Sequence, residues 1–492
     1  MEDEKTSSRI DTGVSGLNDI LSGGFPIGQM YLLEGDPGTG KTTLAMQFIM
    51  AGVQAGEKAL YLTLSESKAE LEGSARSHGW KTEDLPIVEF IPAEASLNPK
   101  QQYSVFHPRE IELSETIQKL TQLVEEVKPD RLVLDSLSEL RLLAADPMRY
   151  RRQLLALKHF FAGRDTTVLL LDDRTGGQDD RQLQSIAHGV VRLEKMRRTY
   201  GVTRRQAEII KLRGSGYREG FHDYTIAKGG LQIFPRLIAS EHDAPFDGER
   251  IKSELPALDQ MFGGGISRGS STLLIGPSGS GKSTLAMAYA YAAAKRGDRA
   301  IVYTFDEVLR TAQDRAEGLG MAVREEIAKG TLGMVQVNPA ELSPGQFTWR
   351  IRRDVETKDT RVVVIDSLNG FLMSMPGEHD LDLHLHELIA FLNQRGVATF
   401  LIYTQHGLID TMQTEVDVSY LADTVILLRY LEKDSEIRQV VSVIKQRVGR
   451  HERTLRELRM SETGIAISDT LSSFRGVSTP TTDPGDQSGA KD

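Results

Sequence analysis

Cysteine is absent from the 492-residue chain. Disulfide bridges, thiolate metal sites and cysteine nucleophiles are therefore excluded. The sequence also lacks any run of about 18 apolar residues, the length that a membrane-spanning helix requires. Its first residues, 1–5, have neither the basic nor the apolar region of a signal peptide. We expect a cytoplasmic protein without a membrane partner.

An excess of positive charge is missing as well. The formal net charge is −10, so no global basic field attracts nucleic acid, and a nucleic-acid partner is not expected. Hydrophobic residues make up 39% of the chain and charged residues 26%, which is typical of a globular protein with sizeable cores. The length predicts two to four domains.

Two glycine-rich stretches, 35–42 and 276–283, fit the phosphate-binding pattern G-x-x-x-x-G-K-[ST]. Each follows an apolar run typical of a buried strand, and residues 43–49 after the first are typical of a helix, the context that the motif requires. In such loops backbone N–H groups surround phosphate oxygens, the lysine reaches the β- and γ-phosphates, and the next hydroxyl binds Mg²⁺. The alternative is a tight turn without a ligand, which the flanking context disfavours.

The residues that we expect to bind the nucleotide are those of the two loops and the first helical residue after each. They are Gly35, Asp36, Pro37, Gly38, Thr39, Gly40, Lys41, Thr42 and Thr43, and then Gly276, Pro277, Ser278, Gly279, Ser280, Gly281, Lys282, Ser283 and Thr284.

The two loops belong to a duplicated unit. The spacing between Lys41 and Lys282 is 241 residues, and Glu66 and Glu307 share it. An internal repeat of this kind decides the fold. We expect a first domain at 1–238, a linker at 239–249, a second domain at 250–471 and a disordered tail at 472–492, which has few apolar residues.

Apolar strand-like runs alternate with helical stretches in both halves, for example 59–64 and 112–127 in the first. Near-continuous apolar strands between helices predict an α/β fold, in which each domain is a mainly parallel sheet flanked by helices. Ligands of such sheets lie at the carboxyl ends of the strands, where both loops fall.

An aspartate ends a short apolar run in each half, Asp135 in the first and Asp366 in the second. We expect each to hold Mg²⁺ together with the loop hydroxyl, Thr42 or Ser283. The alternative role is to cap the next helix. Another acidic pair, 172–173, ends the third strand of the first half, where the second half has residues 404–405; such residues either sense the γ-phosphate or only mark the end of the strand.

Hydrolysis needs a group that orients or deprotonates the attacking water. Glu66 and Glu307 follow equivalent strands, so we predict this role for both, the alternative being solvated strand ends.

Two cations alternate on a strand near the end of each half: Lys211 and Arg213, then Lys445 and Arg447. Alternate side chains of a strand lie on the same face. In a ring assembly these cations could reach the γ-phosphate of a neighbouring copy, whereas on an isolated edge strand they would only discourage aggregation.

With these elements in place, the chain resembles the KaiC family, the double-domain ATPases of the bacterial circadian clock within the RecA-like superfamily. The similarity covers roughly residues 8–472. It rests on the tandem loops, on the Asp-Ser-Leu segments at 135–137 and 366–368, and on segments 211–214 and 423–428. The resemblance implies tandem RecA-like domains and a homo-oligomer, a hexamer of two stacked rings with ATP at subunit interfaces. It also implies slow hydrolysis in the first ring and autophosphorylation in the second.

The adjacent acidic pair of that family corresponds here to residues 65–66, with serine first, and to Asp306 and Glu307. The resemblance gives Asp306 the role of activating an acceptor hydroxyl, and the two acceptors correspond to Ser419 and Tyr420, of which Ser419 keeps the family chemistry. It further implies a KaiB-like partner on the first ring. The short C-terminal tail lacks the family's regulatory loop, so a KaiA-like activator is not expected.

Two other functions stay open at this point. A RecA-like DNA-dependent ATPase of the recombination or helicase type shares the core fold. A nucleotide-gated signalling scaffold without kinase activity would use nucleotide binding only to set its assembly.

Overall fold

A computed structural model describes residues 8–90, 108–144, 146–174, 180–197, 201–373, 381–405, 420–433, 436–462 and 464–470. The chain forms two compact units, Met1–Arg236 and Leu237–Asp492. The limits predicted for the domains and the linker stay predictions, and the predicted tail at 472–492 lies outside the described residues. Within the described ranges, none of the helices combines the length and apolarity needed to cross a bilayer.

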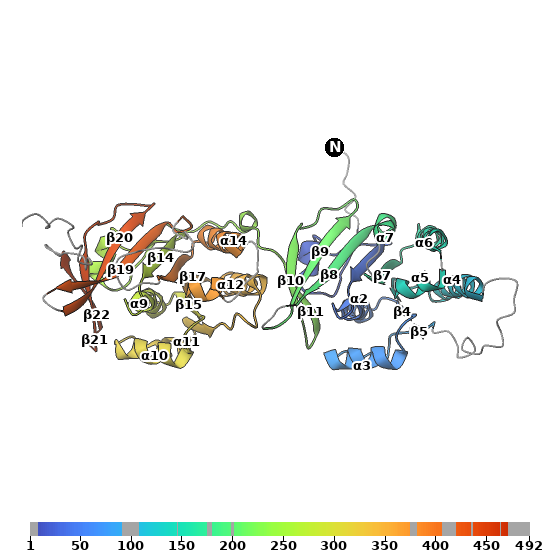
Figure 1. The fold of residues 1–492 in the computed structure, drawn as a ribbon, viewed down its shortest axis with the longest axis horizontal. Helices are drawn as coiled ribbons and strands as arrows, with labels where there is room; N and C mark the ends of the chain where they lie inside the picture. Colours follow the sequence, from blue (N-terminus) through green and yellow to red (C-terminus); the bar gives the residue numbers. More distant parts are fainter. Residues whose placement is uncertain are drawn as a thin grey trace, which may run out of the picture. The chain divides into compact units, whose positions relative to one another are not determined.

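The first unit is built on a nine-stranded sheet (Figure 1). Counted in the spatial order given below, the first six strands run parallel to one another, and each of the last three is antiparallel to the strand before it. In spatial order they are β5 (Ile87–Glu89), β4 (Ala59–Thr63), β6 (Arg131–Asp135), β7 (Thr167–Asp173), β3 (Met30–Gly35), β8 (Gly189–Met196), β9 (Arg204–Leu212), β10 (Phe221–Ala227) and β11 (Gly230–Phe234).

The second unit repeats this topology strand for strand, again with six parallel and three antiparallel strands. The spatial order is β16 (Leu332–Gln336), β15 (Arg299–Thr304), β17 (Thr360–Asp366), β18 (Ala398–Thr404), β14 (Ser271–Gly276), β19 (Thr424–Lys433), β20 (Glu436–Gln446), β21 (Arg456–Ser461) and β22 (Gly464–Thr470). Each unit adds a two-stranded sheet, β1 (Arg9–Ile10) with β2 (Phe25–Pro26) and β12 (Arg250–Ile251) with β13 (Ile266–Ser267). The predicted α/β fold with two mainly parallel sheets is confirmed.

Helices cover both faces of the first sheet because its strands are apolar on both faces. Tyr31 and Leu33 of β3 pack in a core with α2 (Lys41–Gln54) and α3 (Lys68–His78). The alternate residue Leu32 packs in the opposite core. The helices on that second face are α4 (Pro108–Val127), α5 (Leu137–Ala144), α6 (Pro147–Phe161) and α7 (Asp180–Ile186), and the short α1 (Leu17–Ile20) joins the first core.

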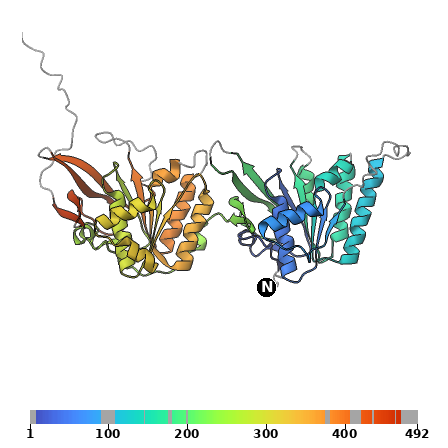
Figure 2. The same ribbon diagram turned by 90° about the horizontal axis from the view of Figure 1, so that it is seen from below.

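The second unit has the same layers, and Figure 2 shows the helices of each unit gathered on both sides of its strands. Leu274 of β14 lies in one core and the alternate residue Leu273 in the other, each core being completed by helices of the second unit. The helices are α8 (Pro256–Met261), α9 (Lys282–Lys295), α10 (Leu309–Gly318), α11 (Val323–Lys329), α12 (Pro344–Lys358), α13 (Leu368–Met373) and α14 (Leu381–Gln394), with a 3₁₀ turn η3 (Ala239–Glu241) before them.

Local sequence explains where several helices begin. Ser67 caps α3 with a capping box to Glu70, and Ser343 caps α12, which has Pro344 in its first turn. The helix predicted at 43–49 is the longer α2, and the run predicted as a strand at 59–64 is β4. Both sheets therefore place the glycine loops at the carboxyl ends of their central strands, β3 and β14.

Candidate active sites

The glycine loop of the first unit joins β3 directly to α2. Gly40 is the residue before α2 and has φ +99°, and a Cβ there would lie 2.6 Å from Ile226 Cδ1. Gly281 before α9 has φ +98°. Only glycine fits such a left-handed, crowded position, so the first helical N–H groups stay accessible to an anion. All the loop residues predicted to bind nucleotide lie between the two strands and the first turns of α2 and α9.

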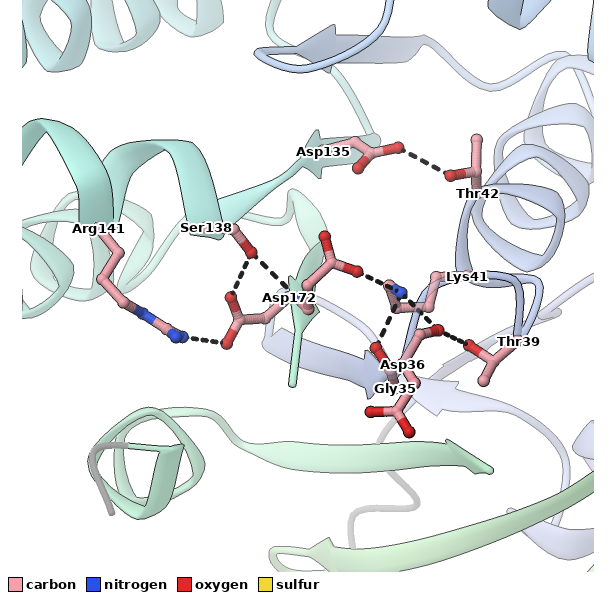
Figure 3. A network of polar contacts seen from close by, with 10 residues as sticks. Gly35, Asp36, Thr39, Lys41, Thr42, Asp135, Ser138, Arg141 and Asp172 are labelled. Carbon is pink, nitrogen blue, oxygen red and sulfur yellow. Dashed lines mark hydrogen bonds and ion pairs between the residues drawn. The ribbon is translucent and has the colours of Figure 1, made fainter. Parts of the chain in front are cut away.

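Lys41 curls back over the loop, as Figure 3 shows. Its Nζ donates to the carbonyl oxygens of Gly35 at 2.9 Å and Asp36 at 3.2 Å, and forms a 2.6 Å ion pair with Asp173 Oδ1. Thr39 Oγ1 donates to Asp36 O at 2.8 Å and so braces the turn. The ammonium group of Lys41 is therefore held against the glycine loop.

Lys282 occupies the same place in the second unit. Its Nζ donates to Gly276 O at 3.0 Å and Pro277 O at 2.7 Å. Burial lowers the pKa of Lys282 to about 8, against the opposing effect of the Asp366 carboxylate. A phosphate would stabilise the charged ammonium in this desolvated position.

The two predicted Mg²⁺ ligands of each unit meet. Thr42 Oγ1 donates to Asp135 Oδ2 at 3.2 Å (Figure 3), and Tyr61 OH donates to the same oxygen at 2.7 Å. Asp135 is buried, and this burial raises its pKa although both hydrogen bonds oppose the shift. In the second unit Ser283 donates to Asp366, whose pKa burial also raises.

These donor sets fit Mg²⁺. The described residues contain no cluster of three or more side chains able to enclose a metal. Mg²⁺ needs none, because it takes one or two protein oxygens and completes its shell with water and phosphate. A hydroxyl and a buried, desolvated carboxylate beside a phosphate loop are such a pair.

The glutamates predicted to prepare water lie just after β4 and β15. Thr63 Oγ1 accepts from Glu66 N at 3.0 Å and donates to Glu66 O at 2.8 Å, and Thr304 repeats this pattern with Glu307. Burial, followed by the charge of Asp135, raises the pKa of Glu66. Such a carboxylate is a stronger base than an exposed glutamate.

The second site has Arg315 and Asp306 where the first has Ser74 and Ser65. Arg315 of α10 donates to Glu307 Oε1 at 2.6 Å, and Asp306 Oδ2 accepts from Ser367 Oγ at 2.6 Å. A pocket of about 580 Å³ lies over the loop and is bounded by Lys282, Arg315 and Met460. Its volume suits a nucleotide-sized ligand. Ser419 lies outside the described residues.

The four predicted trans-acting cations lie at the carboxyl ends of β9 and β20, two strands away from β3 and β14, and Arg213 and Arg447 come directly after those ends. Lys211 pairs with Val190, which is level with Leu32, three residues before the end of β3. Lys211 Nζ donates to Gln184 O, and Arg213 to Ser185 O at 2.8 Å, both on the α7 segment that precedes β8.

The second unit places its pair likewise. Lys445 pairs with Val425, which is level with Leu273, and its Nζ donates to Ala422 O at 2.8 Å. Arg447 donates to Tyr420 O at 3.0 Å. The structure thus brings together the loops, aspartates and glutamates of each unit, and keeps the cations apart from them.

Two carboxylates at the end of β7 do more than the sequence indicated. Asp172 is buried, forms an ion pair with Arg141 and accepts from Ser138 Oγ at 3.1 Å (Figure 3), while Asp173 pairs with Lys41. Strand register aligns Asp173 with Gly35 and Thr404 with Gly276. The counterpart of 172–173 is therefore 403–404, one residue earlier than the expected 404–405. In the sequence, the only indication of these contacts is that two acidic residues end an apolar strand.

Comparison with known proteins agrees with this geometry. The family model described as "ATPase: KaiC" matches residues 10–238 and 251–472. The chain is 28% identical to the circadian clock oscillator protein KaiC of Acaryochloris marina, over 96% of this chain and 91% of that protein. It is 26% identical to the circadian clock protein KaiC3 of a Synechocystis species, over 97% and 95% of the two chains. The chain belongs to the KaiC family, with a RecA-like P-loop ATPase domain in each half.

Proposed function

We propose that each unit binds ATP with Mg²⁺ on its P-loop and hydrolyses it within a ring-shaped homo-oligomer, most simply a hexamer. One observation carries this proposal: Lys211 and Lys445 lie two strands away from β3 and β14, level with the third residue of these strands and not with the loops that follow them. Three residues of strand span about 10 Å, beyond which the loop itself extends. Cations so placed serve the site of a neighbouring copy.

The residues of one site divide the chemistry among them. Lys41 and the loop N–H groups bind and orient the phosphates, and Thr42 with Asp135 would hold Mg²⁺, which supplies positive charge against the phosphates when bound. Glu66 accepts a proton from the water whose oxygen attacks the γ-phosphorus, and ADP leaves. In the second unit Lys282, Ser283, Asp366 and Glu307 take these roles.

We further propose a kinase reaction of the second unit, in which Asp306 accepts the proton of the Ser419 hydroxyl, the hydroxyl oxygen of Ser419 takes the γ-phosphoryl group of ATP, and ADP leaves. The carboxylate of Asp306 lies beside Glu307 at the end of β15, where it already binds a serine hydroxyl, that of Ser367. Intact-mass measurement after incubation with ATP tests this. One added phosphoryl group that is lost in Ser419→Ala supports it, and no added mass contradicts it.

We also propose a clock-like or signalling role, which the names of the clock-protein relatives support. A cytoplasmic location and a KaiB-like protein partner on the first unit are further proposals, which follow from the family resemblance alone. A nucleotide-gated scaffold is the second candidate function of the second unit, because Arg315 already binds the Glu307 carboxylate there and so occupies the group expected to accept a proton from water. The scaffold would be favoured if the second unit hydrolyses ATP far more slowly than a protein partner exchanges.

The deciding experiment measures particle mass by light scattering with and without ATP–Mg²⁺ while phosphate release is recorded. We expect assembly with ATP and turnover that falls on dilution. A monomer that hydrolyses ATP at a rate independent of its concentration would contradict the proposal. Stimulation by DNA would point instead to a DNA-dependent motor.

A further inference from the structure

The two units differ at the residue that closes the strand beside the loop. In the first, Asp173 Oδ1 lies 2.6 Å from Lys41 Nζ. In the second, the same register position is Thr404, whose backbone N–H and carbonyl bind the side-chain amide of Asn369 at 2.7 and 3.0 Å. One lysine therefore has a carboxylate partner and the other has none at this position.

The Asp173 carboxylate is held in place by its neighbours. Asp173 N donates to Ser138 Oγ at 3.1 Å, and that hydroxyl donates to Asp172 Oδ1 at 3.1 Å. Asp172 is 2% exposed and forms an ion pair with Arg141 of α5 (Figure 3). A buried carboxylate paired with a guanidinium is a strong anchor. The end of β7 is thus fixed, and Asp173 faces the loop lysine.

The charge balance around the two lysines is also different. Glu66, Asp135 and Asp173 act on one another electrostatically around a single ammonium, that of Lys41. In the second unit Arg315 stands beside Glu307 and adds a second cation next to Lys282 at the pocket. Glu307 interacts there with Asp366, which also has Asp306 nearby, so three carboxylates face two cations in the second unit and three face one in the first. A triphosphate entering the first unit therefore meets one more carboxylate that no cation balances.

We propose that Asp173 is an internal anion that takes the place of phosphate on Lys41, so that ATP binding to the first unit depends more strongly on a divalent cation than ATP binding to the second. The second unit, with Thr404 in that place, binds the metal-free nucleotide with a smaller loss of affinity. This inference rests on the proposed function, since both units must bind ATP–Mg²⁺. Phosphate oxygens displace the carboxylate from Lys41, and a divalent cation offsets the negative charge that the displaced carboxylate leaves beside the phosphates.

The test compares ATP affinity with Mg²⁺ and with EDTA by calorimetry, one unit at a time. Lys282→Ala leaves the first loop intact, and Lys41→Ala leaves the second. One charge about 10 Å from the phosphates, at an effective dielectric constant near 20, changes affinity by about tenfold or more. We therefore expect EDTA to weaken binding about a hundredfold in the first unit and about tenfold in the second.

Two exchanges isolate the residue. Asp173→Asn, or Asp173→Thr as in the second unit, should reduce the EDTA effect in the first unit to about tenfold. Thr404→Asp should enlarge it in the second unit. Melting curves show whether each variant is folded. If one of the three substitutions prevents folding, the other two still test the inference. The inference is overturned if Asp173→Asn and Asp173→Thr leave the EDTA effect in the first unit unchanged. The proposed function is overturned instead if neither the Lys282→Ala protein nor the Lys41→Ala protein binds ATP–Mg²⁺.

Discussion

Arg315 donates to Glu307 across 2.6 Å in the second unit, and the first unit has Ser74 at the equivalent position. The helices that carry them, α3 and α10, begin at equivalent residues, Lys68 and Leu309. The glutamate expected to prepare water is thus engaged by a cation in one unit, while the burial-raised pKa of Glu66 marks a stronger base in the other. The two units therefore have equivalent glutamates after equivalent strands, but the charged side chains around these glutamates differ.

Releasing Glu307 should speed hydrolysis in the second unit. In the Lys41→Ala background, Arg315→Ser should raise kcat about three- to tenfold, because the carboxylate oxygen is freed to accept from water. KM should rise as well, since Arg315 lines the pocket. Steady-state phosphate release measures both. The reverse change, Ser74→Arg in the Lys282→Ala background, should lower kcat in the first unit, and an unchanged or higher value would contradict this account.

Each loop lysine should account for one nucleotide per chain. Lys41→Ala and Lys282→Ala should each halve the bound ATP at saturation, because Nζ is fixed at the mouth of its own loop. The affinity lost at the altered site should be at least about a hundredfold, as a charge-assisted contact to phosphate is removed. Equilibrium dialysis counts the sites. Lys68→Ala, on the surface of α3, is the matched control and should leave both sites filled.

Hydrolysis by the first unit should have a bell-shaped pH dependence. Burial lowers the pKa of Lys211 to about 8 from 10.5, so this cation is charged below pH 8 and loses its charge as the pH rises through that value. The pKa of Glu66 is raised above 4.5, so the base is protonated and turnover is lost as the pH falls through that raised value. Phosphate release by the Lys282→Ala protein gives the profile. Lys211→Arg should extend activity above pH 8, and an unshifted basic limb would exclude Lys211 from turnover.

Arg131 should be a major determinant of stability in the first unit. It is 1% exposed, forms an ion pair with Glu57 and donates to Asp11 O at 2.6 Å and Phe48 O at 2.7 Å. Arg131→Ala should destabilise that unit by about 3–5 kcal/mol, because it leaves buried carbonyls and Glu57 without their partner. The denaturant midpoint of the first unit measures this.

Arg131→Met is the control for that prediction, because it keeps most of the volume. The second unit has Val362 at this register position, so the fold accepts an apolar residue there. The methionine variant should lose clearly less stability than the alanine variant. Equal losses would mean that the ion pair and hydrogen bonds contribute little beyond packing.

The fold could be predicted because its signals are local and repeated. Apolar runs before each loop give β3 and β14, and the constant spacing from Lys41 to Lys282 indicates two copies. The Asp173–Lys41 pair could not be predicted, since it depends on the exact register of β7 against β3. The Arg315–Glu307 pair depends likewise on the rotation of α10 about its axis. A shift in register within both β8–β9 and β19–β20, just before the cations, also has no signal in the sequence.

Mixing two inactive variants tests most directly whether sites are completed by a neighbouring copy. In the Lys282→Ala background, one protein carries Lys41→Ala and the other carries Lys211→Ala with Arg213→Ala. If the cations act across an interface, random mixed rings restore about a quarter of the interfaces, those joining an intact loop to intact cations, and turnover appears on mixing. No turnover in the mixture, or full turnover in the Lys211→Ala, Arg213→Ala protein alone, would contradict the account.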